Sequence, residues 1–304
     1  MYENLLIGTK DTTYDMKYEK LITNKKILIT GGAGFVGSHL AKKLYDYGNT
    51  IYVLDNYFTG RRSNQHKGIN YKKSDTINIF SIYKNISLDY IYHLGEYSKV
   101  EQSYDDIELV LKFNTSPFYE VLKLAKKHQS KLIYAGSSTK FSQKSDVVES
   151  PYSFSKKINT NILNKYAEWL NLKYAITYFY NVYGPKEISD GKYATVIGKF
   201  LRLKKENSKF LPVTKPGNQK RRFTHIDDIV NGLILVGKKG SGDDYGIGAD
   251  QSYSIIQIAN ILKMPYKLTP LKKGNRIDGL LKTSKTKKLG WRQKNYLKDY
   301  LLKN

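Results

Sequence analysis

The stretch KILITGGAGFVGSHL, residues 26–40, decides the fold that we predict for this chain. Its first five residues form a short, mostly apolar run that ends at glycines, which is typical of a buried strand. Apolar side chains then recur at helical spacing as far as residue 47. A strand, a glycine-rich turn and a helix in this order predict a unit that binds a dinucleotide, because the helix N-terminus attracts a pyrophosphate.

Three glycines in this turn have separate physical tasks. We expect Gly31 to make the tight turn, Gly34 to let the backbone approach the pyrophosphate, and Gly37 to let helix and sheet pack closely. An acidic residue, Asp55, lies 18 residues beyond Gly37, at the end of the next predicted strand. Its carboxylate is suited to accept hydrogen bonds from the adenosine ribose and it repels a 2′-phosphate, so NAD is predicted rather than NADP.

Strand-like and helix-like segments alternate through the first 180 residues. The predicted strands are 26–30, 51–54, a weaker one near residue 71, 88–94, 131–135 and 174–179, and the predicted helices are 34–47, 117–128 and 152–172. This alternation implies right-handed crossovers and a parallel sheet, whose ligands bind at the carboxyl ends of the strands. The predicted fold class is therefore α/β, a Rossmann-type doubly wound parallel sheet with a smaller α/β C-terminal substrate domain.

The 304 residues are many for one core and suit two domains. We expect an N-terminal extension at 1–25, an NAD-binding domain at 26–180 with returning segments near 223–250, and a substrate-binding domain at 181–304. No secretory signal is recognisable, and no run approaches the roughly 18 apolar residues of a membrane helix. The absence of cysteine excludes thiol catalysis and thiolate metal sites, and no metal site is expected. It fits a reducing, cytoplasmic location.

The formal net charge of +24 raises nucleic acid as a partner. Lysine supplies 44 of the 51 basic residues and is scattered along the chain, whereas arginine occurs only seven times. Because arginine is the residue suited to bidentate contacts with phosphates and bases, we do not expect nucleic acid to be the partner. A lysine-rich surface and an anionic small-molecule substrate account for the charge equally well.

Tyr152 and Lys156 begin the last predicted helix of this series, four residues apart and therefore on one helix face. An ammonium near a phenol stabilises the phenolate, which can remove a proton from a substrate hydroxyl while hydride leaves the carbon for a nicotinamide. Tyr119 and Lys123 have the same spacing. They lie in the middle of the preceding helix, away from the carboxyl end of a strand, and we expect them to be a surface pair.

The loop before the 152–172 helix supplies hydroxyl groups. Ser137, Ser138 and Thr139 follow the strand KLIYA after one glycine, where a ligand of a parallel sheet binds. They are suited to hold the reacting alcohol, although serine and threonine also cap turns without any further role.

Eight segments taken together resemble a known family. They are TGGAGFVGSHL, VLDN, YHLGEYSKVEQS, YAGSST, SPYSFSK, YNVYGP, RRFTHIDDIV and KKLGW, between about residues 26 and 291. The resemblance is to the extended short-chain dehydrogenases, and more narrowly to the NAD-dependent epimerase/dehydratase family, such as UDP-glucose 4-epimerase. The glycine turn alone is shared with many enzymes, whereas the ordered set is specific to this group.

The resemblance implies a role for each matching position. Tyr152 is the implied base, Lys156 is its partner, and Ser137 with Ser138 is expected to hold the substrate hydroxyl. The residues implied to hold NAD are Gly31, Gly34, Phe35, Val36, Gly37, Asp55, Asn56, Asp75, Thr76, Leu94, Gly95, Ser98, Tyr152 and Lys156.

Substrate contacts are implied in the second half of the chain. Asn181 in YNVYGP matches a phosphate contact, and Arg221 and Arg276 match arginines that bind the diphosphate of the sugar nucleotide, which guanidinium groups suit. Arg222 replaces a usual Asp, and residues 278–279 invert the more common Gly-Asp order. These two departures leave the identity of the substrate open.

Other departures bear on the chemistry. The 4,6-dehydratases of the family carry an Asp-Glu pair directly after the catalytic hydroxyl, where this chain has Ser138 and Thr139. These residues cannot act as a carboxylate acid and base, so we do not expect dehydration. Glu96 and Tyr97 replace a small residue and a glutamine, and the segment 142–151 is short, which predicts an open sugar pocket.

We therefore expect NAD-dependent oxidation at carbon 4 of a nucleotide-activated hexose or heptose, foremost as a nucleotide-sugar 4-epimerase. A 4-dehydrogenase that releases the keto sugar, for example one acting on a GDP-heptose, uses the same residues and stays open. A non-catalytic nucleotide- or RNA-binding protein on this fold is a third hypothesis, but it predicts loss of the tyrosine, lysine or serine. By analogy with relatives that pair through the helices at 107–129 and 152–171, we expect a homodimer.

Overall fold

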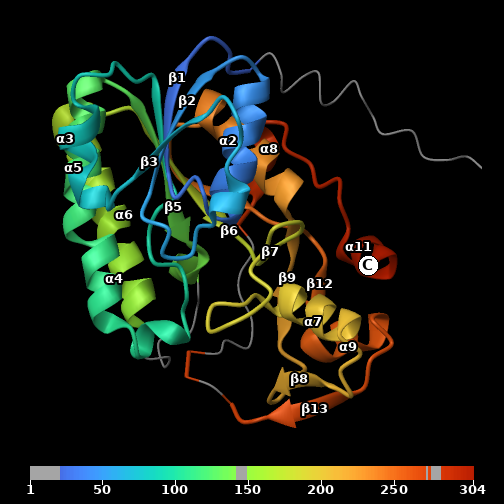
Figure 1. The fold of residues 1–304 in the computed structure, drawn as a ribbon. Helices are drawn as coiled ribbons and strands as arrows, with labels where there is room; N and C mark the ends of the chain where they lie inside the picture. The colour runs from blue at the N-terminus through green and yellow to red at the C-terminus, as the bar shows by residue number, and fades with distance from the viewer. Residues whose placement is uncertain (1–20, 142–148, 272, 275–281) are drawn as a thin grey trace, which may run out of the picture.

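Seven parallel strands form the central sheet of the structure, a computed structural model that describes residues 21–141, 149–271, 273–274 and 282–304 (Figure 1). The spatial order of the strands is β11-β6-β5-β4-β1-β2-β3. They are β1 (Lys26–Thr30), β2 (Thr50–Asp55), β3 (Asn70–Lys73), β4 (Tyr90–His93), β5 (Lys131–Ser137), β6 (Tyr174–Phe179) and β11 (Gly242–Ile247). The order reverses between β1 and β4, as in a doubly wound sheet, so the predicted fold class is confirmed.

Helices cover both faces of this sheet, which explains why its central strands are nearly continuous apolar runs. One face is covered by α2 (Phe35–Asp46) and α8 (Ile226–Lys239). The other is covered by α3 (Ile79–Tyr83), α5 (Ser116–His128) and α6 (Pro151–Leu170), and α4 (Ile107–Asn114) lies against α5 and α6. The long α6 begins sharply at Pro151, where the hydroxyl of Ser150 accepts a hydrogen bond from the Ser153 N–H at 3.1 Å.

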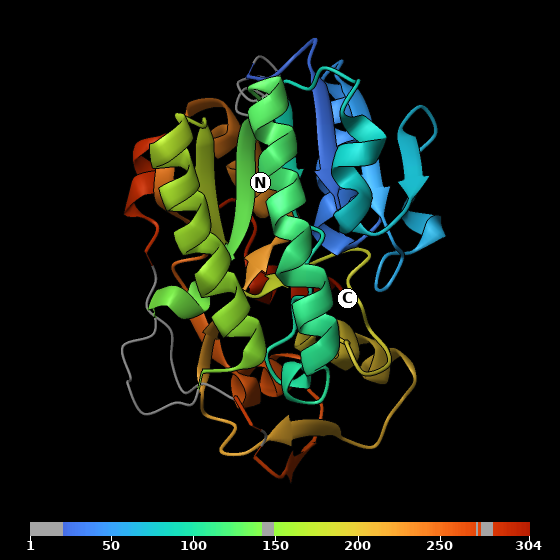
Figure 2. The ribbon, with the colours of Figure 1, turned by 90° about the vertical axis from the view of Figure 1, so that its left-hand side faces the viewer.

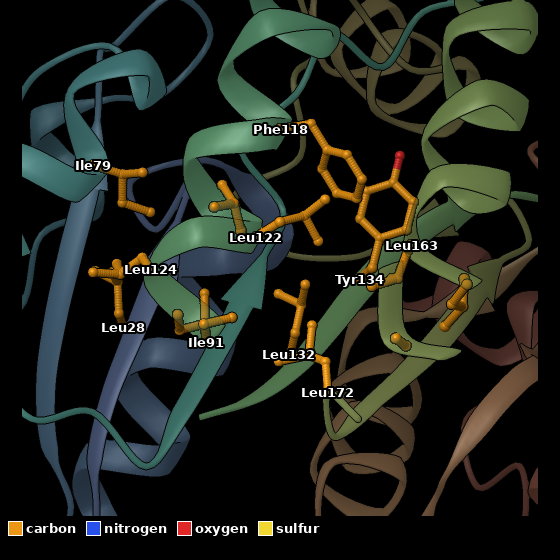
Figure 3. Packing of buried hydrophobic residues seen from close by; sticks show 14 of the residues in the cluster. Leu28, Ile79, Ile91, Phe118, Leu122, Leu124, Leu132, Tyr134, Leu163 and Leu172 are labelled. Atoms are coloured by element: carbon orange, nitrogen blue, oxygen red, sulfur yellow. The ribbon is translucent and has the colours of Figure 1, made fainter. Parts of the chain in front are cut away.

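The core beneath α5 and α6 is built from apolar and aromatic side chains of both layers (Figure 3). Phe118 of α5 meets the ring of Tyr134 of β5 with 4.9 Å between ring centroids, and Leu163 of α6 is buried in the same cluster. Each fully buried side chain of this kind stabilises the fold by about 1.5–3 kcal/mol. This packing sets where α6 lies against the sheet, and α6 carries Tyr152 and Lys156.

The strands predicted at 26–30 and 174–179 have those bounds in the structure. The weak strand near residue 71 is β3, which pairs with β2 in parallel. The strand predicted at 88–94 is shorter, because the Asp89 carboxylate accepts a hydrogen bond from the Lys26 N–H at 2.9 Å and the ladder begins after it. The predicted helices differ from the observed ones by one or two residues at their ends.

After β6 the chain leaves the large sheet and forms a second, smaller core. Here β8 (Leu211–Thr214) pairs in parallel with β13 (Tyr266–Thr269), and β9 (Lys220–Arg222) pairs antiparallel with β12 (Ser252–Ser254). The helices of this core are α7 (Val196–Lys205), α9 (Ile255–Ile261) and α11 (Leu297–Lys303). Between these elements β7 (Val182–Tyr183) pairs with β10 (Thr224–His225), and α8 and β11 return to the large sheet, in the region where returning segments were predicted.

Residues 1–20 of the predicted N-terminal extension lie outside the described residues, and its last part does not stand free of the large domain. Ile22 is buried in the core beneath α2 and α8, and its carbonyl oxygen accepts a hydrogen bond from Asn49 at 2.9 Å. Across the described ranges, we find no helix with the length and apolarity that a membrane span requires.

The C-terminal segment is held to α8 by one buried carboxylate. Asp228, in the first turn of α8, accepts hydrogen bonds from the backbone N–H groups of Lys294 at 3.2 Å and Asn295 at 2.9 Å. Trp291, which follows α10 (Ser284–Lys288), is buried and donates from Nε1 to the carbonyl oxygen of Asp228 at 2.9 Å. Burial raises the pKa of the Asp228 carboxyl to about 6, although these hydrogen bonds act in the opposite direction.

Asparagine at position 228 tests this anchor through the pH dependence of stability. An acid whose pKa is raised in the folded state stabilises the fold while it is protonated. This contribution is fully present below a pH of 3.8, the usual pKa, and is lost as the pH rises through about 6. The free energy of unfolding of the wild type, minus that of Asp228→Asn, should fall by about 2–3 kcal/mol between pH 4 and pH 7. Urea unfolding measures this difference. Asp227→Asn, an exposed change in the same turn, is the control. If the difference in the free energy of unfolding is independent of pH for Asp228→Asn as well as for this control, the prediction is contradicted.

Candidate active site

A cavity of about 460 Å³ opens at the carboxyl ends of the central strands. All the residues predicted to hold NAD line it, and they come from separate stretches of the chain: Gly31, Gly34, Phe35, Val36, Gly37, Asp55, Asn56, Asp75, Thr76, Leu94, Gly95, Ser98, Tyr152 and Lys156. Ile188 and Thr195, which follow β7, line the same cavity. The cavity therefore joins the ends of the large sheet to the beginning of the second half of the chain.

The glycine turn is crowded at two positions where any side chain would collide. Gly31 has a φ of +69°, and a Cβ built on it would lie 2.8 Å from the Cα of Gly95 in the turn after β4. A Cβ on Gly37 would lie 2.1 Å from the Gly31 carbonyl oxygen. Gly34 is the N-cap of α2 and provides no side-chain cap. The first N–H groups of α2 are thus left for an anion at the cavity wall, which fits the pyrophosphate of NAD.

Asp55 ends β2 at the same wall. Its carboxylate accepts hydrogen bonds from the N–H groups of Ala33 and Tyr57, both at 2.8 Å. Burial raises the pKa of this carboxyl, although the backbone hydrogen bonds oppose the effect. Asn56 donates from Nδ2 to Asp75 Oδ1 at 2.7 Å, which ties the ends of β2 and β3 together. A carboxylate held by the glycine turn itself fits the ribose contact that the sequence predicts.

Tyr152 and Lys156 both line the cavity from the first turns of α6, as their spacing predicts. Tyr152 is half-buried, and its hydroxyl makes no hydrogen bond within the described part of the chain. Lys156 is buried, and its ammonium donates to the Ala135 carbonyl oxygen at 2.5 Å. Its second partner is the carboxylate of Glu96, which the sequence analysis noted only as a departure.

Glu96 is the most densely hydrogen-bonded side chain of the site. Besides the ion pair with Lys156, its carboxylate accepts from the Tyr134 hydroxyl at 3.0 Å, from Asn159 Nδ2 at 2.9 Å and from His93 Nε2 at 3.2 Å. Burial alone would raise the pKa of this carboxyl, but the Lys156 charge and the hydrogen bonds from His93 and Lys156 outweigh burial and hold the pKa below its usual value. Glu96 is therefore an anion beside the predicted catalytic pair.

The residues predicted to contact the substrate do not line the cavity where the structure describes them. Ser137 is buried, its Oγ accepts from the Thr139 N–H at 3.3 Å, and neither Ser137 nor Ser138 lines the cavity, although Ala135 and Gly136 do. Asn181 and Arg221 also lie outside the lining.

Two of these substrate positions have local partners. Asn181 donates to the Arg222 carbonyl oxygen at 2.9 Å, and Arg221 donates to the Lys220 carbonyl oxygen at 3.1 Å. Arg276 lies outside the described residues. The substrate roles of all these residues stay predictions.

Lys99 also lines the cavity, although no motif in the sequence predicts this. Burial lowers the pKa of its ammonium to about 8, although the negative charge of Glu187 opposes this. Within the described residues its Nζ has no hydrogen-bond partner. The available signal was its place shortly after a buried strand, the same signal that identifies Asp55. Ile188 and Thr195 carry no comparable signal, because they belong to no recognisable motif.

The NAD dependent epimerase/dehydratase family matches residues 27–248. The chain belongs to this family. The matching range includes the glycine turn, Asp55, Glu96, Tyr152 and Lys156. The family assignment and NAD as the cofactor, both predicted from the sequence, are confirmed.

Curated relatives within this family act on nucleotide sugars. The chain is 31% identical over 258 residues to UDP-glucuronic acid decarboxylase 1 of Xenopus tropicalis, a match that covers 79% of this chain and 60% of that protein. It is 30% identical over 263 residues to UDP-N-acetyl-alpha-D-glucosaminuronate decarboxylase of Bacillus cytotoxicus, with 77% and 78% covered. The chain thus spans about 60% of the length of the Xenopus relative.

Solved structures share the fold over most of the chain. UDP-glucose 4-epimerase of Thermotoga maritima, solved with UDP-glucose, has a TM-score of 0.83 at 26% identity, with 91% of this chain and 96% of that chain covered. An epimerase from Methanothermobacter thermautotrophicus has a TM-score of 0.88 at 24% identity and covers 96% and 94%. The first likeness links the fold to a nucleotide-sugar enzyme, and the second shows the fold alone.

Proposed function

We propose that this chain oxidises carbon 4 of a nucleotide-activated sugar with NAD and returns the hydride, as a nucleotide-sugar 4-epimerase. The observation that carries this proposal is the shared cavity. Tyr152 and Lys156 line it together with the open N-terminus of α2 and with Asp55, although these groups are far apart in the sequence. One ligand space therefore contains both a proton acceptor and a binding surface for a dinucleotide.

The residues divide the work as follows. Ionised Tyr152 accepts the proton of the C4 hydroxyl, and the ammonium of Lys156 on the same helix face favours that ionised form. Ser137 and Ser138, at the end of β5, are proposed to orient the hydroxyl. NAD supplies the acceptor for the hydride. Epimerisation then requires the keto sugar to turn over before the hydride returns, and a 4-dehydrogenase differs only in releasing the keto sugar.

The same site argues against loss of water. Ser138 and Thr139 stand where the dehydratases of the family have an acidic pair, and neither hydroxyl is a carboxylate acid or base. The acid nearest to the catalytic pair is Glu96, whose oxygens are already engaged by four donors. We therefore propose redox chemistry at carbon 4 without elimination.

A second candidate is decarboxylation of an acidic nucleotide sugar, which Lys99 favours. Oxidation at C4 of a sugar with a carboxylate on C5 gives a β-keto acid, which loses carbon dioxide readily. A solvent proton then takes the place of the carboxylate, and the returned hydride restores the alcohol. Lys99 offers a cation in the cavity whose Nζ has no hydrogen-bond partner among the residues that the structure describes, which suits such a carboxylate. The relatives named above as decarboxylases also support this candidate.

We also propose a homodimer. Figure 2 shows α6 and the α4–α5 pair side by side on the face turned to the viewer. Large apolar side chains of these helices are exposed: Ile107, Leu111, Tyr119, Phe154, Ile162 and Trp169. An apolar surface of this kind on three neighbouring helices suits a second copy of the same chain, because a two-fold interface pairs a patch with itself.

The catalytic assignment is tested by Tyr152→Phe, with Tyr119→Phe as the matched control. Both tyrosines have a lysine four residues later, but the side chain of Tyr119 is 57% exposed and lies outside the cavity. We expect Tyr152→Phe to lower kcat by about 10²–10⁴-fold and Tyr119→Phe to leave it unchanged, because only Tyr152 faces the cavity. Initial rates with UDP-, GDP-, CDP- and dTDP-sugars, read by product NMR and NADH absorbance, measure this. Full activity of Tyr152→Phe would rule out this assignment.

The two candidate functions are separated by Lys99→Met, with Lys112→Met as the control. Lys112 also lines the cavity but is exposed. If Lys99 binds a carboxylate, Lys99→Met lowers kcat/KM for UDP-glucuronic acid about 10- to 100-fold and spares UDP-glucose. In the wild type, KM for UDP-glucuronic acid should also rise above about pH 8, where Lys99 loses its charge. Equal losses with both sugars, or turnover of neutral sugars alone, count against decarboxylation.

The dimer is tested by Trp169→Glu, whose side chain is 71% exposed in the wild type. A charge within this apolar surface should turn the dimer into a monomer. Light scattering after size exclusion distinguishes 35.0 kDa from twice that mass. Leu302→Glu, an exposed change on α11, is the control and should leave the mass unchanged. A wild type of 35.0 kDa at all concentrations would refute the homodimer.

A further inference from the structure

We infer that Glu96 is a positioning residue that acts through Lys156 and sets the pH range in which Tyr152 serves as the base. This inference rests on the proposed function. Glu96 does not need to touch the sugar for this role. It works by holding the buried ammonium of Lys156, which lies four residues along α6 from Tyr152 and lines the same cavity, and by adding a fixed negative charge to the site.

The position of Glu96 is tightly determined by its partners. Its side chain is only 1% exposed, and its four donors come from different elements: His93 of β4, Tyr134 of β5, and Lys156 and Asn159 of α6. Asn159 also donates to the Asn114 carbonyl oxygen at 2.5 Å, which extends the network to α4. A carboxylate with this many partners cannot turn away from Lys156 without leaving buried donors unpaired.

The hydrogen bonds around Thr30 identify the state of His93. The Thr30 hydroxyl oxygen accepts from the N–H groups of Leu94 at 3.1 Å and Gly95 at 3.0 Å, which occupies both of its lone pairs. Its proton therefore points to His93 Nδ1, at 2.7 Å, and this nitrogen is the acceptor. His93 then carries its own proton on Nε2 and donates it to Glu96 as a neutral ring. Lys156 is left as the single cation that balances Glu96.

The charges of the site determine whether loss of Glu96 raises or lowers the pH at which Tyr152 ionises. With Glu96 and Lys156 both ionised, the pair is neutral, so ionisation of Tyr152 creates a net negative charge in a buried region. Without Glu96, the free charge of Lys156 would favour that ionisation at lower pH. The other charged or titratable groups that line the cavity are Asp55, Asp75, Tyr97, Lys99 and Lys112. These groups are the same in the wild type and in a variant without Glu96, so they do not change the direction of the pH shift.

The variant Glu96→Gln tests this inference. It keeps the shape of the side chain and one of the two acceptor oxygens, and it removes the charge. We expect the acid limb of the kcat/KM profile to move to lower pH by about one unit or more. Glu108→Gln, an exposed removal of the same charge on α4, should leave the profile in place. A lower maximum of kcat/KM without a shift of its acid limb would mean that Glu96 has only a structural role, and would overturn the inference.

A second readout does not depend on turnover. Absorbance at 295 nm reports tyrosine ionisation, and the difference between a protein and its Tyr152→Phe derivative isolates Tyr152 from the other tyrosines. The midpoint for Glu96→Gln should lie below that of the wild type. This titration needs no turnover of a nucleotide sugar. A failure of the proposed function and a failure of this inference can therefore be distinguished. If Glu96→Gln does not fold, Glu96→Asp lengthens the distance to Lys156 and should give a smaller shift of the same sign. Unmoved midpoints in both variants would overturn the inference.

Discussion

The hydroxyl of Thr30 joins the two strands on which the site depends. It ends β1, receives the N–H groups of Leu94 and Gly95 from the turn after β4, and orients His93. At this crossing Gly31 passes so close to Gly95 that neither residue has room for a Cβ. The close approach of β1 and β4, where the strand order reverses, therefore places the glycine turn for the dinucleotide beside Glu96. Glu96 in turn holds Lys156 of α6, so one contact aligns the cofactor surface with the predicted base.

The charges along the cavity follow the chemistry that each part is proposed to perform. Asp55, held by the Ala33 N–H of the glycine turn, lines the cavity, and we propose that it binds the ribose. The Glu96–Lys156 pair is neutral and lies beside Tyr152, where a proton must be exchanged. Lys99, for which the described part of the chain provides no hydrogen-bond partner, adds a cation at the cavity wall. This distribution suits oxidation of an alcohol on an anionic substrate, and because positions 138–139 carry no acid, the proposed reaction does not include elimination of water.

Much of the fold and part of the site can be predicted from the sequence, for physical reasons that differ between residues. Buried parallel strands are short apolar runs, and glycine turns tolerate few alternatives, so β1, α2 and the residues that line the cavity around them follow from local pattern. Tyr152 and Lys156 also follow, because their helix begins after a strand. The Glu96–Lys156 pair does not, since its members are 60 residues apart and meet only through sheet order. Arg221 and Asn181 were predicted from motifs, and the structure places them outside the cavity lining.

The central claim is that the cavity oxidises carbon 4 of a nucleotide sugar, and a deuterium isotope effect tests it most directly. UDP-glucose and UDP-glucuronic acid, each deuterated at C4 or at C3, would be mixed with the NAD-loaded protein in a stopped-flow spectrometer. The transient rise at 340 nm that reports hydride transfer should slow severalfold with deuterium at C4 and remain unchanged with deuterium at C3. A full-speed transient with the C4-deuterated sugars, or slowing with the C3-deuterated ones, would contradict the account.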